Sequence, residues 1–156
     1  MEKMRVLLFV ILASILTVSI GFAADTGFRA KLTGKSEVPS VKTKAKGDVK
    51  FKLSEDGMSL SYKLEVKNIE NTTAAHIHRG MKGKNGGPVA NLFTGPKKEG
   101  KFSGNLSEGT IMAKDLTGDL MGKTLDDLVQ LIKAGDAYVN VHTDANPDGE
   151  IRGQIK

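Results

Sequence analysis

The stretch VKFKLSEDGMSLSYKLEV, residues 49–66, decides the fold class. Apolar residues alternate with charged or hydroxyl-bearing residues on both sides of Glu55-Asp56-Gly57, which has the composition of a turn. An alternation with a period of two places one set of side chains on a buried face of a strand and the other set in water. Two such runs around a glycine-containing turn predict a β-hairpin.

Strand-like segments recur along the rest of the chain. Strands are predicted at 28–32, 49–53, 58–66, 74–78, 89–93, 101–106, 110–113, 138–142 and 150–155. Eight or more short strands with glycine-rich turns are typical of a sandwich or a barrel. We therefore predict an all-β protein, a Greek-key-like antiparallel β-sandwich or barrel.

Helical spacing appears in one place, at Leu125, Leu128, Val129 and Ile132. Apolar residues at these intervals form one face of a helix. Thr124 is suited to the N-cap, and Gly135 can end the helix in a left-handed conformation. The sequence predicts one short helix near residues 124–134.

Residues 1–23 have the pattern of a secretory signal peptide. A short basic start precedes an apolar run over 6–20, and the small residues Gly21 and Ala23 follow at positions suited to cleavage. A retained membrane anchor is the alternative, but the run is shorter than the roughly 20 apolar residues that span a bilayer. We expect an extracytoplasmic protein, periplasmic or secreted, with no stable membrane insertion after cleavage and one β domain over 24–156.

Charge and aromatic content argue against nucleic-acid binding. The chain has 23 Lys and Arg against 18 Asp and Glu, for a net charge of +5, but only two Tyr, six Phe and no Trp. Grooves that bind single strands combine positive charge with stacking aromatic side chains. The chain also has no cysteine, so that its stability rests on its core and not on disulfides.

All three histidines of the chain lie in predicted strands. His76 and His78 are alternate residues, so they share a face, with Cα atoms roughly 6.5–7 Å apart. His142 shares a face with Tyr138 and Asn140. If the two strands are neighbours, three ring nitrogens meet with a fourth position open, as in copper or zinc sites. The alternative is that each histidine is a hydrogen-bonded structural residue.

Two loops flank these histidines. Residues 79–88 contain four glycines and form a mobile or sharply folded loop; a strand and not a helix follows it, which argues against a nucleotide-binding loop. Its basic residues either attract an anion or are simply solvated. Asn146-Pro147-Asp148-Gly149 predicts a tight turn. Beyond it, Glu150 and Arg152 share a strand face, and we expect Arg152 to anchor a neighbouring carboxylate or loop carbonyl.

Several of these segments together resemble the CHRD domain family, first named from chordin. The matching segments are 28–34, Glu37-Val38-Pro39, 75–80, 83–89, 134–143 and 146–154. The chain departs from the family pattern at Ser40, where a second proline is common. The resemblance implies an extracytoplasmic module without an established catalytic activity, found in an extracellular growth-factor antagonist and in stand-alone exported microbial proteins.

A looser likeness is to copper–zinc superoxide dismutase, a β-sandwich with a His-x-His strand. That family uses six histidines and an aspartate for two metals, and only His76, His78 and His142 exist here. No cysteine and no serine in a nucleophile elbow is present. We therefore expect a binding or interaction module, with an extracellular protein, a glycan or a copper or zinc ion as partner. A small copper redox enzyme is the alternative.

Overall fold

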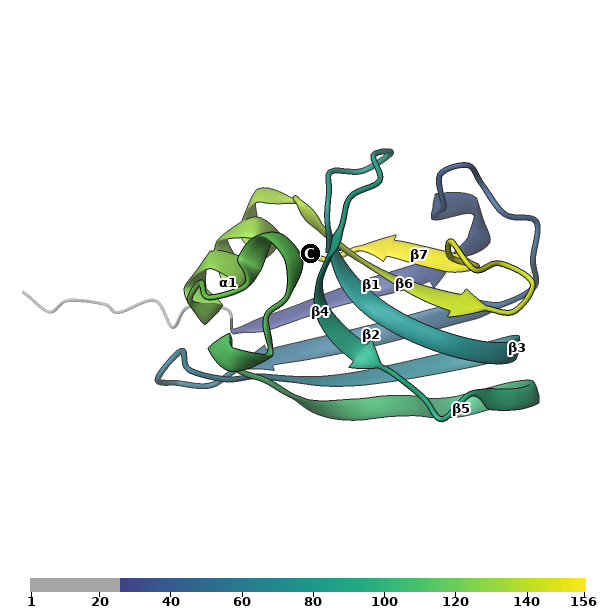
Figure 1. Cartoon of the computed structure of the whole chain (residues 1–156), viewed down its shortest axis with the longest axis horizontal. Helices are drawn as coiled ribbons and strands as arrows, with labels where there is room; N and C mark the ends of the chain where they lie inside the picture. The colour runs from purple at the N-terminus through teal and green to yellow at the C-terminus, as the bar shows by residue number, and fades with distance from the viewer. Residues whose placement is uncertain (1–25) are drawn as a thin grey trace, which may run out of the picture.

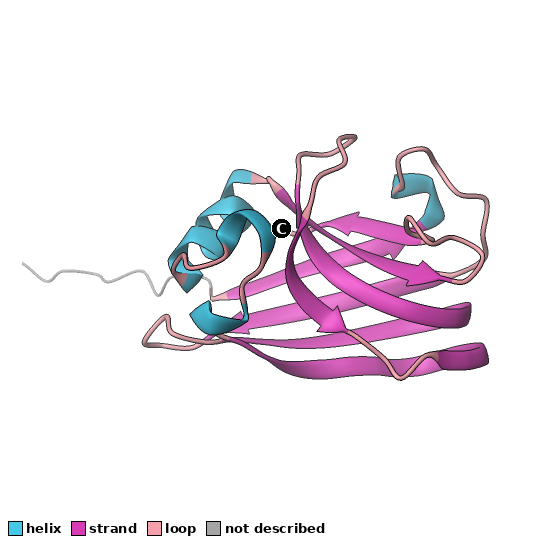
Figure 2. Cartoon of the chain, viewed as in Figure 1, coloured by secondary structure: helices cyan, strands magenta, loops and turns pink. Residues whose placement is uncertain are grey.

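Seven strands and one α-helix make up residues 26–156, the part of the chain that the computed structural model describes (Figure 2). The strands are β1 (Gly27–Thr33), β2 (Lys46–Leu53), β3 (Leu60–Arg79), β4 (Pro88–Phe93), β5 (Lys98–Ile111), β6 (Ala137–Thr143) and β7 (Ile151–Gln154). The helix is α1 (Leu125–Ala134), and the 3-10 turns are η1 (Gly34–Ser36), η2 (Ala113–Asp115) and η3 (Gly118–Leu120). The predicted all-β class is confirmed.

The predicted signal peptide over residues 1–23 lies outside the described residues. Within residues 26–156, no helix has the length and apolar character needed to cross a membrane.

The predicted hairpin around Glu55-Asp56-Gly57 is confirmed. β2 pairs antiparallel with the first half of β3, and Leu53 lies opposite Leu60. Gly57 has a φ of 70°, a value that glycine adopts without steric cost. Met58 was expected on the apolar face of the second strand, and this was wrong: it is 66 % exposed, because the turn extends past it and β3 begins two residues later.

Two pairs of predicted strands are continuous, which reduces nine predicted segments to seven strands. The segments 58–66, from residue 60 on, and 74–78 belong to β3. The segments 101–106 and 110–113 belong to β5 up to Ile111, where the strand ends; the predicted last two residues lie outside it, and Ala113 begins η2. The polar stretch between the halves of β3 has the composition of a loop, yet it stays in the ladder with β5. Asn68 and Asn71 take φ values of 53° and 51°, which asparagine tolerates better than most residues.

All seven strands belong to one sheet, and a bend in β3 closes that sheet into a barrel. Its first half pairs with β2 and β5, and its second half pairs with β6 and β4. The order β2-β1-β7-β6 completes a ring between the two halves. The ring contains five strands, β1, β2, β3, β6 and β7, and every neighbouring pair is antiparallel. Directions can alternate around a closed ring only if the number of straight strands is even, so β3 must bend. Two of its register shifts with β5 fall at Asn68 and Asn71, where bulges bend the strand (Figure 1).

The core fills the inside of this barrel with the alternate apolar residues that the sequence pattern predicts. On β1, for example, Phe28, Ala30 and Leu32 are buried, whereas Arg29 and Lys31 between them are exposed. Buried residues of β2, β3, β6 and β7 join them in one cluster. The side chains that β1 directs outward are therefore free to form a surface site.

The predicted helix is confirmed with both of its ends. The Thr124 side chain accepts a hydrogen bond from the Asp127 backbone N–H, and the Asp127 carboxylate accepts one from the Thr124 N–H. This reciprocal arrangement is a capping box. Gly135 ends the helix with a φ of 78°. α1 lies across one end of the barrel and buries its apolar face there (Figure 1).

Candidate metal centre

β6 is buried at every position, which is unusual for a strand of a small barrel. Its odd-numbered residues face the core, whereas Tyr138, Asn140 and His142 face outward. These outward side chains are covered by loops: the Tyr138 hydroxyl contacts the backbone of Gly86, and Asn140 donates to the carbonyl of Asp148. A polar layer is therefore enclosed between the outer face of the sheet and the loops above it.

The three histidines lie together in this layer. β3 and β6 are neighbours, and their register places His76 opposite Asn140 and His78 opposite Tyr138. Ring centroids are 4.9 Å apart for His76 and His142, 5.6 Å for His76 and His78, and 6.0 Å for His78 and His142. One ring nitrogen from each histidine lies within 4.8 Å of the others. The convergence that the strand pattern predicted is therefore present.

Backbone carbonyls fix the orientation of two of the rings. Nδ1 of His78 lies 2.9 Å from the Gly86 carbonyl oxygen, and Nδ1 of His142 lies 2.8 Å from that of Pro147. A carbonyl only accepts, so each Nδ1 carries the proton, and each neutral ring presents Nε2 as a lone pair. This is the arrangement that orients histidine ligands in metal sites.

The remaining nitrogens point at one another. His76 Nδ1 lies 3.0 Å from His142 Nε2, so the His76 Nδ1–H donates a hydrogen bond to that lone pair. His78 Nε2 is buried and has no hydrogen-bond partner among the described residues. Asn140 is close enough to act on the pKa of His78, yet its Oδ1 makes no hydrogen bond with that nitrogen. A buried lone pair without a partner is costly, and a cation between the rings would satisfy it.

Burial keeps all three imidazoles neutral. It lowers the pKa of His76 to about 4, and the nearby His142 and His78 rings add to the effect. Burial also lowers the pKa of His78 and of His142, against the opposing effect of their carbonyl hydrogen bonds. Metal ligands must be deprotonated. All three imidazoles are thus neutral at neutral pH. To bind an ion through Nδ1, His76 would move the proton that it directs at His142 to its own Nε2.

The geometry fits one ion after a small adjustment. Ligand distances near 2.0–2.1 Å place tetrahedral nitrogen ligands about 3.3 Å apart. The 3.0 Å between His76 Nδ1 and His142 Nε2 is close to that separation. The ligand nitrogens of the three histidines lie up to 4.8 Å apart, so the His78 ring would have to move roughly 1–2 Å toward the other two rings to share one ion with them. Imidazole ligands suit zinc, copper, iron and nickel, and the intrinsic affinity order is highest at copper.

Tyr138 and Arg152 complete the layer. The Tyr138 ring stacks on His78 with centroids 5.0 Å apart and an interplanar angle of 13°, and the Arg152 guanidinium carbon lies 3.4 Å from the same ring's centroid. Arg152 also donates to the carbonyls of Met81 and Lys84, as expected for an anchor of a loop carbonyl. It thereby holds the loop that carries Gly86 over the histidines.

Glu150 was expected to have a structural pairing role, and its contacts confirm this. Its carboxylate accepts hydrogen bonds from the hydroxyls of Thr43 and Thr143 and from the side-chain amide of Asn146. These contacts hold the turn between β6 and β7, which places the Pro147 carbonyl beside His142.

Glu37 is the site residue that sequence patterns missed. It is only 7 % exposed, and its Oε1 has no hydrogen-bond partner among the described residues. Burial raises its pKa to about 7, although the charge of Arg152 acts in the opposite direction. Nothing in the local sequence predicts a buried acid there, because the burial depends on the distant β6–β7 turn, whose Gly149 passes close to the Glu37 carboxyl.

Comparison with known proteins gives one family. The family model described as the CHRD domain matches residues 28–155. Neither the curated proteins nor the solved structures that were compared contain a match.

Proposed function

Because the chain belongs to the CHRD domain family, we propose that it is an exported binding module of that family, and that His76, His78 and His142 together hold one copper or zinc ion. Export rests on the signal-peptide pattern of residues 1–23. The metal site rests on the histidine cluster. Export and metal binding are independent parts of this proposal, and each has its own test.

The observation that carries the metal site is the unpartnered Nε2 of His78. A histidine with a purely structural role uses both ring nitrogens or exposes one to water. Here Nδ1 is fixed by Gly86, and Nε2 is buried beside two other neutral imidazoles. Three convergent neutral nitrogens favour a soft or borderline cation, and the intrinsic affinity order favours copper over zinc.

A small copper redox enzyme is the second candidate, because His76 is more exposed than the other two histidines. Three protein ligands leave a coordination position open, and a partly exposed ligand lets a small molecule reach it. Turnover of superoxide by the copper-loaded protein, well above the rate of free copper at the same concentration, would favour this candidate over a binding module.

We expect the purified protein to bind one Cu²⁺, and the His78→Gln variant to bind it at least about 100-fold more weakly. Glutamine keeps a donor for the Gly86 carbonyl but offers no imidazole. Loss of an outer hydrogen-bond partner alone typically costs 10–100-fold in metal affinity, so loss of a ligand should cost at least as much. Competition titration against a chromophoric chelator measures the change.

Thr73→Ala is the matched control, because it changes β3 next to the cluster without removing a ligand. It should leave copper affinity unchanged. Since the pKa values of the three histidines are lowered, copper affinity should fall less between pH 7 and pH 5.5 than the affinity of a synthetic peptide of residues 74–79 with exposed histidines. Equal affinity of the wild type and His78→Gln would return all three histidines to a structural role.

Export predicts that the chain expressed with residues 1–23 is recovered outside the cytoplasm with Ala24 as its first residue. The apolar run ends before small residues suited to a signal peptidase. Mass spectrometry of the extracytoplasmic fraction measures this. An Ala23→Arg variant, which blocks the cleavage position, should remain uncleaved, and an intact wild-type chain in the cytoplasm would contradict export.

A further inference from the structure

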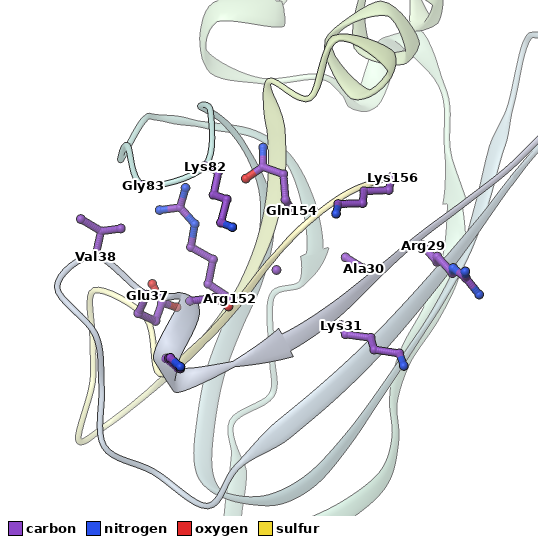
Figure 3. A pocket seen from close by; sticks show the side chains of 13 residues that line it. Arg29, Ala30, Lys31, Glu37, Val38, Lys82, Gly83, Arg152, Gln154 and Lys156 are labelled. Atoms are coloured by element: carbon purple, nitrogen blue, oxygen red, sulfur yellow. The ribbon is translucent and has the colours of Figure 1, made fainter.

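A cavity of about 730 Å³ opens beside the outer face of β1 and β7, separate from the histidine cluster. It lies between these strands, the η1 segment and the loop between β3 and β4. Its cationic lining residues are Arg29, Lys31, Lys35, Lys82, Arg152 and Lys156. Figure 3 shows Arg152 extending from β7 toward the loop that carries Lys82 and Gly83.

The strand pattern explains why positive charge gathers there. Arg29 and Lys31 are the outward residues of β1, and Arg152 is an outward residue of β7, which pairs with β1 at Thr33. At Gly153 the two strands come so close that a Cβ would collide with the Lys31 carbonyl oxygen. Because Gly153 has no side chain, β1 and β7 lie close together there, and the outward residues of both strands line the same cavity.

The cationic side chains of the cavity have no anionic partner within ion-pair distance among the described residues. The described ion pairs join Lys63, Arg79 and Lys97 to acids elsewhere. Glu37 is the one acid that lines the cavity, and burial raises its pKa to about 7, so part of its population is neutral at physiological pH. Six cationic side chains against one partly ionised acidic side chain give the concave site a positive potential.

Arg152 is the clearest sign that an anion is missing. Its side chain is 2 % exposed, and its hydrogen-bond partners are neutral: two carbonyls and the Asn85 amide oxygen. These bonds use three of its five N–H donors. Buried charges are normally paired, because an isolated one is costly to remove from water. An oxyanion at the floor of the cavity would supply the missing charge.

We propose that this cavity binds a small organic polyanion that carries two or more carboxylate, sulfate or phosphate groups. Its volume lies in the range of small-molecule sites, about 300–1,000 Å³, so it accommodates a molecule the size of a mono- or disaccharide. The buried Arg152 contacts one oxyanion, and the exposed lysines at the rim contact the others. The proposed ligand needs no metal, so its binding can be tested without loading the histidine cluster, although Arg152 links the two sites through the Tyr138 ring.

Calorimetric titration at low salt tests the proposal with three polyanionic probes. Citrate carries carboxylates, fructose 1,6-bisphosphate carries phosphates, and a disulfated disaccharide carries sulfates; fructose is the neutral control. At least one polyanion should bind with a Kd below about 1 mM, and its affinity should fall about tenfold between 20 and 200 mM salt because the charges are screened. The strongest probe identifies the kind of oxyanion. Heat no greater than that of fructose for all three would overturn the proposal.

A charge-reversal pair separates the cavity from overall charge. Lys31→Glu with Lys35→Glu changes two rim residues, and Lys101→Glu with Lys114→Glu makes the same change in net charge on exposed residues outside the cavity. The rim variant should bind the best probe at least tenfold more weakly, and the control less than twofold. Both pairs consist of exposed residues, so folding should be retained and circular dichroism confirms it. Equal losses in both variants would show diffuse attraction and reject the site.

Discussion

Replacing Arg152 by methionine is expected to lower the free energy of unfolding by about 3 kcal/mol or more, because three buried acceptors lose their donor. The guanidinium donates to the carbonyls of Met81 and Lys84 and to the Asn85 side chain. Each acceptor that becomes buried without a partner costs about 1–3 kcal/mol. The contact with the Tyr138 ring adds about 1–2 kcal/mol for a desolvated cation–π pair.

Urea denaturation at pH 7 measures this loss as a shift in the midpoint. Methionine is the appropriate replacement because its flexible chain fills most of the arginine volume without a charge. Arg29→Met is the matched control: the same exchange on an exposed arginine of β1 should change stability by less than about 0.5 kcal/mol. A midpoint for Arg152→Met equal to that of the control would mean that the loop holds its position without the guanidinium.

Most of the correct predictions came from the two-residue alternation of side chains along a strand. The alternation of Tyr138, Asn140 and His142, and of His76 and His78, decided which side chains share a face. The same logic placed both groups on one side of neighbouring strands, where the structure has them. Only the adjacency of the two strands was an assumption, and it is correct.

Sequence patterns failed where the chain takes its conformation from distant residues. Asn68 and Asn71 look like loop residues, but the pairing of β3 with β5 and β6 keeps them in a bent strand. Likewise, Glu37 looks like a surface acid. It is buried because the segment after η1 folds back, with the Asn85 side chain donating to the Val38 carbonyl across 47 positions. No local window contains that contact.

The histidine cluster and the cationic cavity share one structural element, the stack of His78, Tyr138 and Arg152. The charge of Arg152 is among the influences that lower the pKa of His78. An oxyanion bound at Arg152 would offset part of that charge. Both sites depend on the same loop, which Arg152 holds through the Met81 and Lys84 carbonyls and which supplies the Gly86 carbonyl to His78.

Glu37→Gln is expected to stabilise the protein at pH 8 by about 3 kcal/mol and to have a much smaller effect at pH 5. Burial raises the pKa of Glu37 from 4.5 to about 7 in the folded state. The unfolded chain therefore releases this proton at a lower pH than the folded chain does. Between the two values the folded state binds more protons, so stability falls as pH rises from 4.5 to 7 and then levels off.

Urea denaturation of the wild type and the variant at pH 5, 6, 7 and 8 measures the difference. Each shift of one pKa unit corresponds to about 1.4 kcal/mol, which gives a change of roughly 2–3 kcal/mol in the difference between pH 5 and pH 8. The histidines also make stability depend on pH: because their pKa values are lowered in the folded state, they destabilise it as pH falls below 6.5. That contribution is common to both proteins and cancels in the difference.

Glu55→Gln, in the exposed hairpin turn, is the control with the same chemical change. A stability difference that stays constant across this pH range would mean that the Glu37 carboxyl is solvated well enough to ionise at its usual pH, and that the cavity floor is more open to water than its burial indicates.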